Sequence, residues 1–277
     1  MKHLTKLLFL FITISAFSQS PWTQEKGKFY TQLSFTSIAN YNSLFGDPEI
    51  LTEREITDNT LQFFGEYGLS DKTSLLVNIP FKLIETGDLT STNLNPTTTA
   101  ATESTLGNIE LGLKHNFYQK DWTISGQFSV EANTSSFDAS SGIRTGYDAW
   151  TFSPLLLAGK SFGDTYIQGF LGANLRTNNY SSNFRFGGEI GSRLGKHVWL
   201  IAFLDVSSSF KNGDVVIPQE NILTGLYVND QEFGAFGLKA IGEISENFGI
   251  TAGFGGAFSG NNVAKQGALN IGLYHKF

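Results

Sequence analysis

Histidine is the side chain best suited to acid–base or metal chemistry near neutral pH, and three histidines follow the first eighteen residues. His115, His197 and His275 are widely separated and show no metal-ligand spacing. His115 with Ser125 is the one pair that would suit a hydrolase acting on lipid, and an ordinary interfacial histidine explains His115 better. We therefore expect no catalytic residue, no cofactor and no metal site.

Carboxylates gather early in the chain, between residues 47 and 58. Five acidic side chains in twelve positions raise the alternative of a loosely bound calcium ion, because calcium prefers oxygen ligands. A solvated acidic loop is the favoured interpretation. The residues are Asp47, Glu49, Glu53, Glu55 and Asp58.

A second set of charged residues lies at alternate positions of apolar segments, where one face would point into a barrel. Both signs are present, so this face predicts either a salt-bridged, water-filled or nearly plugged interior or a selective path for a small solute. The candidate lumen-lining residues are Glu66, Lys82, Glu110, Lys114, Glu131, Arg176, Arg185, Glu189, Arg193, Asp205, Lys239 and Glu243.

The segments that carry these charges alternate apolar and polar residues with period two, the pattern of β-strands. Leu75, Val77 and Ile79 form one such apolar face, and Ile124 and Phe128 belong to another. The pattern predicts an all-β chain: a closed antiparallel transmembrane β-barrel of about twelve strands in an up-and-down meander. The expected strands are 27–41, 58–69, 72–84, 105–118, 121–133, 147–161, 164–177, 183–194, 197–210, 231–244, 247–259 and 262–277.

Composition supports this class. The chain has 277 residues, 30 Gly, 25 Phe and no Cys, and its mean hydropathy of −0.09 is far below that of a helical membrane protein. The net charge is −6, and it becomes −8 without Lys2 and Lys6. An acidic chain of this kind argues against a nucleic-acid partner.

The first residues resemble a signal peptide. Lys2 and Lys6 precede an apolar run, and Ala16 and Ser18 supply a small-residue exit. We expect residues 1–18 to be a cleaved signal peptide and 19–277 to form the barrel domain. The alternative of a membrane-anchoring helix needs about 20 apolar residues, more than this run contains.

The expected connections alternate between short turns, such as Ser70-Asp71, and longer loops. Outer-membrane barrels place tight turns in the periplasm and long loops outside. The long connections predicted are 42–57, 85–104, 134–146 and 211–230, with short ones at 178–182 and 260–261. This order predicts a protein of the cell outer membrane, contacting its lipid, with both termini in the periplasm. The final strand, ending in Phe277, resembles the segment that barrel assembly machinery reads.

A family resemblance rests on Thr105-Leu-Gly-Asn-Ile-Glu-Leu-Gly-Leu-Lys114 and on the later Gly146-Tyr147. These segments resemble the transporter barrels of the phenol-degradation MetA-type family over residues 58–277. This chain has Gly107-Asn108 where members usually show Gly-Asp. The resemblance implies passive uptake of small, hydrophobic compounds. The overall style also resembles uncharacterised outer-membrane barrels of Bacteroidota.

Two functions therefore stay open at the level of sequence. The first is a passive, porin-like channel for a small-molecule solute, which a polar interior favours. The second is a structural or surface-interaction barrel whose lumen is closed and whose external loops carry the function. Bulky Trp199, Phe203 and Phe233 on the expected inner face favour the second.

Overall fold

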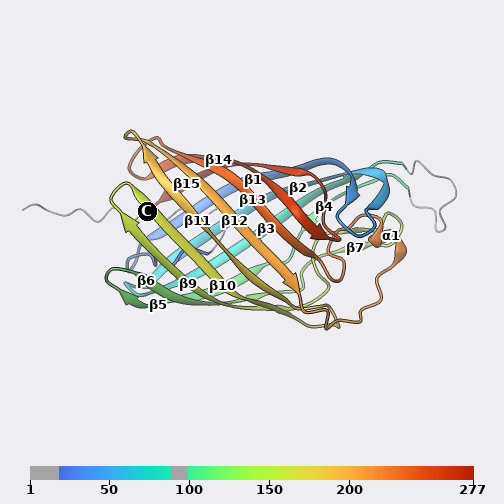
Figure 1. Ribbon diagram of the computed structural model, residues 1–277, viewed down its shortest axis with the longest axis horizontal. Coiled ribbons are helices and arrows are strands. Elements are labelled where there is room, and N and C mark those ends of the chain that lie inside the picture. The colour runs from blue at the N-terminus through green and yellow to red at the C-terminus, as the bar shows by residue number, and fades with distance from the viewer. Residues whose placement is uncertain (1–18, 89–98) are drawn as a thin grey trace, which may run out of the picture.

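The structure is a computed structural model that describes residues 19–88 and 99–277. Within them, twelve antiparallel strands form one closed sheet, because β2 pairs with β1 on one side and with β3 on the other (Figure 1). The predicted all-β barrel of about twelve strands is confirmed. The barrel strands are β1 (Phe29–Leu44), β2 (Ile50–Ser70), β3 (Thr73–Thr86), β5 (Glu110–Gln119), β6 (Thr123–Glu131), β9 (Thr151–Phe162), β10 (Thr165–Arg176), β11 (Asn183–Leu194), β12 (Val198–Ser209), β13 (Glu232–Glu243), β14 (Phe248–Asn261) and β15 (Gly267–Lys276).

The first and last strands close the barrel. β1 and β15 pair in continuous register from Tyr30 opposite Lys276 to Ser37 opposite Leu269. Phe277 extends the seam, since its backbone N–H donates to the Phe29 carbonyl at 2.8 Å. A sheet closed in this way leaves no barrel strand with an unpaired edge, which is the condition for crossing a bilayer with strands.

The outer surface of the barrel is apolar and the inner surface is largely polar. Leu171 on β10 is 51% exposed, and its register partners Leu156 and Phe186 are also exposed. Gln168, an inward-facing residue of the same strand, is buried. This inversion of the usual globular pattern is the one that a hydrocarbon environment selects.

The hairpin of β1 and β2 is longer than predicted. The sequence prediction of a loop over 42–57 is wrong, because β1 continues to Leu44, β2 begins at Ile50 and only 45–49 connect them. The period-two signal is present in this region: Thr52, Arg54 and Ile56 are buried, and Leu51 and Glu55 are exposed. Its acidic residues masked the alternation.

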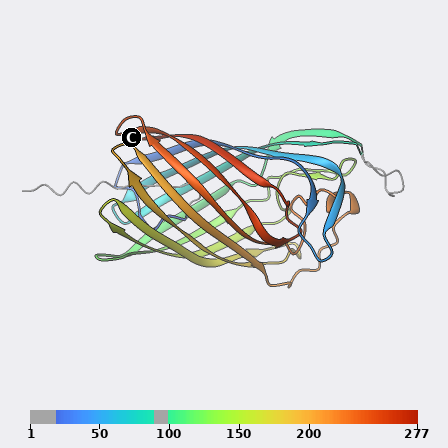
Figure 2. The same ribbon diagram turned by 45° about the horizontal axis from the view of Figure 1, so that its top comes forward.

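A further strand, β4 (Ala101–Leu106), extends the sheet beyond the barrel. It pairs with the later half of β3, whereas β5 pairs with the earlier half. The predicted single strand over 105–118 is therefore broken at 107–109. Gly107 donates its N–H to the Pro80 carbonyl at 2.9 Å, and a Cβ there would lie 2.9 Å from the Thr145 carbonyl oxygen. Figure 2 shows β2, β3 and β4 reaching past the other strands.

The other long connections also carry structure. Residues 134–146 contain the small hairpin β7 (Phe137–Asp138) and β8 (Ile143–Arg144), and residues 211–230 contain a single helical turn, α1 (Gln219–Ile222). The loop expected over 85–104 is shortened by β3 and β4, and most of the remainder, 89–98, lies outside the described residues. β14 runs through Asn261, so the last connection is 262–266 rather than 260–261. Among the described residues, no helix is long and apolar enough to cross a membrane.

Leu171→Arg tests which surface meets lipid. Placing an arginine at the middle of β10 on the exposed apolar face should cost about 2–4 kcal/mol of stability in a bilayer. Denaturant titration of the barrel refolded into vesicles, read by heat-modifiable gel mobility, measures this loss. Leu171→Met is the matched control and should stay near the wild-type value. Equal stability of the arginine variant would contradict a lipid-facing position.

Candidate functional site: the barrel lumen and its two covers

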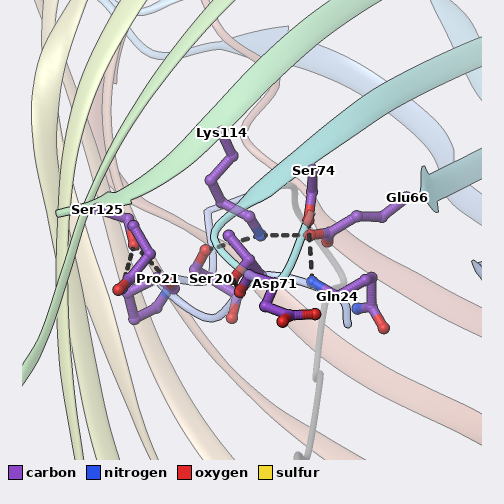
Figure 3. Close-up of polar contacts among 10 residues, drawn as sticks. Ser20, Pro21, Gln24, Glu66, Asp71, Ser74, Lys114 and Ser125 are labelled. Atoms are coloured by element: carbon purple, nitrogen blue, oxygen red, sulfur yellow. Dashed lines mark hydrogen bonds and ion pairs between the residues drawn. The ribbon is translucent and has the colours of Figure 1, made fainter. Parts of the chain in front are cut away.

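An N-terminal segment, residues 19–26, enters the barrel at the end with the short turns. Three of its backbone groups bond to side chains of the wall (Figure 3): the Ser20 carbonyl accepts from Lys114 Nζ at 3.0 Å, the Pro21 carbonyl accepts from Ser125 Oγ, and Gln24 N–H donates to Ser74 Oγ at 2.9 Å. Residues 19–26 were predicted only as part of the barrel domain, and no local sequence pattern indicates that they enter the lumen.

Ring packing holds the same segment against the wall. The Trp22 ring meets Tyr166 edge-on at 5.9 Å between centroids. Gly159 provides the space, because a Cβ at that position would lie 2.8 Å from Pro21 Cγ and 3.0 Å from the Trp22 ring. Trp22 also packs against the largest buried apolar cluster. That cluster contains Tyr30, Phe64, Leu76, Tyr166, Trp199, Ile201, Ile241 and Tyr274. The short-turn end of the lumen is therefore covered.

A buried ion pair lies beside this cover. Lys114 Nζ is 2.9 Å from Glu66 Oε1, and each side chain is only 1% exposed (Figure 3). Removing charges from water is costly, and the additional bond from Lys114 to the Ser20 carbonyl offsets part of that cost. The pair thus connects β5, β2 and the N-terminal segment.

The opposite end is covered by a lid, which we define as residues 137–144 together with 219–228. Asn221, fully buried, joins the two parts: its side chain accepts from Arg144 Nε at 3.1 Å and donates to the Leu226 carbonyl at 2.8 Å and the Gly142 carbonyl at 3.3 Å. Asp138 caps the hairpin turn, and hydrogen bonds from Ser141 and Ser140 hold the pKa of Asp138 below its ordinary value.

The extended β1–β2 hairpin anchors the lid to the wall. Tyr41 donates its hydroxyl to the Thr224 carbonyl at 2.8 Å, and Arg54 Nη2 donates to the Ser141 carbonyl. Leu226 is buried in a cluster with Ile84 on β3 and Ile143 in the hairpin. The apolar character of 218–229, noticeable in the sequence, is explained by this inward packing.

Two neighbouring cavities lie in the lumen and share Gln62, Asn174 and Arg185 in their walls. The first, the polar chamber, measures about 230 Å³ and is lined mostly by amides, hydroxyls and the carboxylates Glu110 and Glu131. The second, the ring-lined chamber, measures about 530 Å³. Its aromatic lining residues are Tyr147, Tyr227, Phe203, Phe233 and Phe254.

Most of the charged residues proposed from sequence occur as ion pairs in the barrel wall. Nine of the twelve belong to five pairs, with Asp58 as the additional partner. The pairs are Lys82–Asp58, Lys114–Glu66, Arg185–Asp205, Arg193–Glu243 and Lys239–Glu189. The remaining three are Glu110, Glu131 and Arg176. Arg176 stacks its guanidinium on the Tyr147 ring at 3.9 Å and donates to the Ser181 carbonyl at 2.9 Å.

The residues considered for hydrolysis are not assembled. Ser125 is buried and bonded to Pro21, whereas His115 is exposed beside Phe117 and bonds Thr73 Oγ1 at 2.9 Å. Gly159-Lys-Ser161-Phe-Gly163 matches the Gly-x-Ser-x-Gly pattern of hydrolase nucleophiles. It lies at the end of β9 and in the turn to β10, whereas a nucleophile elbow joins a strand to a helix.

The comparisons with known proteins identify similar folds but no family. No protein-family model matches the chain, and no curated protein matches it. Among solved structures, the COG4313 outer membrane channel from Pseudomonas putida F1 superposes with a TM-score of 0.69 at 12% identity, covering 96% of this chain and 100% of that one. The translocator domain of the autotransporter NalP from Neisseria meningitidis gives 0.54 at 12% identity, covering 91% and 90%. The KdgM porin gives 0.51 at 8% identity, covering 89% and 99%. At such identities these likenesses show the shared barrel fold.

Lys114→Met tests the buried ion pair. Leaving Glu66 buried without its partner should destabilise the barrel by about 3–5 kcal/mol, whereas Glu66→Leu combined with Lys114→Met should recover much of the loss. Thermal unfolding followed by loss of heat-modifiable mobility measures both variants. A double variant as unstable as the single one would show that the charge itself is not the cause.

Asn221→Leu tests the lid. Removing the buried amide leaves the Leu226 carbonyl and Arg144 Nε without partners, at a cost of about 1–3 kcal/mol. We expect faster backbone hydrogen exchange over 137–144 and 223–228 and unchanged exchange in the barrel strands. The exposed neighbour Ile222→Leu is the control. Unchanged exchange in the lid would mean that Asn221 does not hold it.

Proposed function

We propose that this chain is an outer-membrane channel that passes a small solute passively. The two neighbouring chambers inside the closed barrel carry the proposal, because they provide space and hydrogen-bonding groups along the lumen, between the two covers. The apolar outer face supports a membrane position. The resemblance of several solved outer-membrane channels to this fold supports the same interpretation.

The proposal includes an orientation. Phe277 lies at one end of the barrel, together with the short turns β2–β3, β5–β6, β9–β10, β11–β12 and β13–β14. The lid and β4 lie at the other end (Figure 1). Short turns belong to the periplasmic side in outer-membrane barrels, which supports periplasmic termini and an external lid. Export by residues 1–18 and recognition of β15 by assembly machinery belong to the same proposal.

The solute class and the absence of catalysis are also part of the proposal. The resemblance of 105–114 to phenol-degradation barrels supports a small, hydrophobic solute, and the rings of the second chamber suit such a molecule. Transport without catalysis is supported by the separation of His115 from Ser125, whose side chains lie on opposite faces of the wall.

A second candidate is a structural or surface-interaction barrel with a closed lumen. The observation that favours it is the presence of two covers, since the N-terminal segment and the lid are each fixed by buried hydrogen bonds. In that case the external loops would carry the function. Conductance separates the two candidates.

Gly159→Leu in planar bilayers tests the channel directly. The added side chain collides with Pro21 and Trp22, so it should displace the N-terminal segment and raise the single-channel conductance above that of the wild type. Ala158→Leu places the same side chain at the adjacent, outward position and should leave conductance unchanged. Small steps in the wild type with larger ones in the variant are expected. No conductance in either protein would favour the closed, structural barrel.

A further inference from the structure

We propose that Glu110 and Glu131 bind a monovalent inorganic cation in the polar chamber and make the conduction path cation-selective. The site itself stands on the geometry of the chamber, and only its role in conduction rests on the proposed function. Both residues line this chamber together with uncharged oxygen-bearing side chains.

The two carboxylates are forced together by strand register. Glu110 begins β5 and Glu131 ends β6, and they are direct cross-strand partners. Side chains at opposite positions of an antiparallel pair lie about 4.5–5.5 Å apart at Cβ, and like charges there are destabilising. A cation between them removes the repulsion.

The remaining charges of the wall do not neutralise this pair. Among the described residues, five luminal cations are matched one to one by five carboxylates. Glu110 and Glu131 have no ion pair in that part of the chain. Among the described residues that line the two chambers, Arg176 is the one cation without an ion pair. Arg176 interacts electrostatically with Glu131, but its guanidinium is stacked on Tyr147 and bonded to Ser181. With both carboxylates ionised, Glu110, Glu131 and Arg176 together carry a formal charge of −1.

Amide groups hold the two carboxylates in place, and one hydroxyl oxygen beside them has no partner. Asn78 Nδ2 donates to Glu110 Oε2 at 3.4 Å and Asn108 Nδ2 donates to Glu131 Oε1 at 2.9 Å, so each carboxylate is held by an amide on one oxygen. The Ser129 hydroxyl lines the same chamber, is only 1% exposed as a residue, and has no hydrogen-bond partner among the described residues. It is a buried acceptor free to contact an ion.

This donor set suits a singly charged ion. Divalent calcium takes six to eight oxygens, usually with several carboxylates. Here two carboxylates are offset by Arg176, and Ser129 supplies a hydroxyl oxygen. A partly hydrated potassium or sodium ion matches both the net charge and the space of about 230 Å³.

The direct test is crystallographic and does not depend on conduction. Crystals of the full-length barrel soaked in rubidium chloride should show an anomalous peak between the Glu110 and Glu131 carboxylates. The peak should be absent in the variant Glu110→Gln/Glu131→Gln, whose fold is verified by the same diffraction data. A wild-type chamber without rubidium would overturn the site, whatever the conductance.

Reversal potentials in a potassium chloride gradient test its role. The wild type should favour potassium over chloride. In the double variant the potassium-to-chloride permeability ratio should fall by roughly threefold or more, the effect expected of a unit charge several ångströms away in water. Glu49→Gln, which removes one exposed carboxylate outside the lumen, should have no effect, and Arg176→Gln should increase the preference. An unchanged reversal potential in the double variant would overturn the inference. A barrel that holds rubidium but never conducts would refute the proposed channel and keep the site.

Discussion

The closed ring of backbone hydrogen bonds is the constraint on which the rest of this structure depends. A strand that crosses hydrocarbon must have its N–H and C=O groups paired, and β1 and β15 provide the last pairing around the ring. Closure of twelve strands leaves an interior wide enough for side chains and two chambers. It also fixes the inward positions, so that residues as distant as Glu66 and Lys114 are brought into contact.

Because the outside must be apolar, polarity is concentrated inside, and the interior must satisfy it. Ion pairs between nearby strands do this for most luminal charges. Hydrogen bonds to the N-terminal segment and to the lid do it for many of the others. The two covers therefore follow from the same polar lining that would admit a solute. Glu110 and Glu131 are luminal carboxylates without an ion pair among the described residues, and they form the cation site proposed above.

Sequence patterns were sufficient for the barrel because outward and inward positions alternate along most of each strand. Leu171 and Gln168 illustrate a signal that is local and periodic. The N-terminal segment could not be predicted, since Ser20 and Pro21 find their partners, Lys114 and Ser125, about a hundred residues away. The break at 107–109 also depends on distant groups, at Pro80 and Thr145. The alternation indicated which charged residues point inward. It could not show which of them form ion pairs, because that depends on the register between strands.

Uptake by proteoliposomes tests the central claim, passive passage through a closed barrel, most directly. Vesicles containing the purified protein would be mixed with a small labelled solute, in the absence of any ion or proton gradient, beside vesicles without protein. Passive conduction predicts accelerated entry that rises in proportion to protein content and stops at equal concentrations inside and outside. Entry no faster than in protein-free vesicles would contradict the account and leave a sealed barrel.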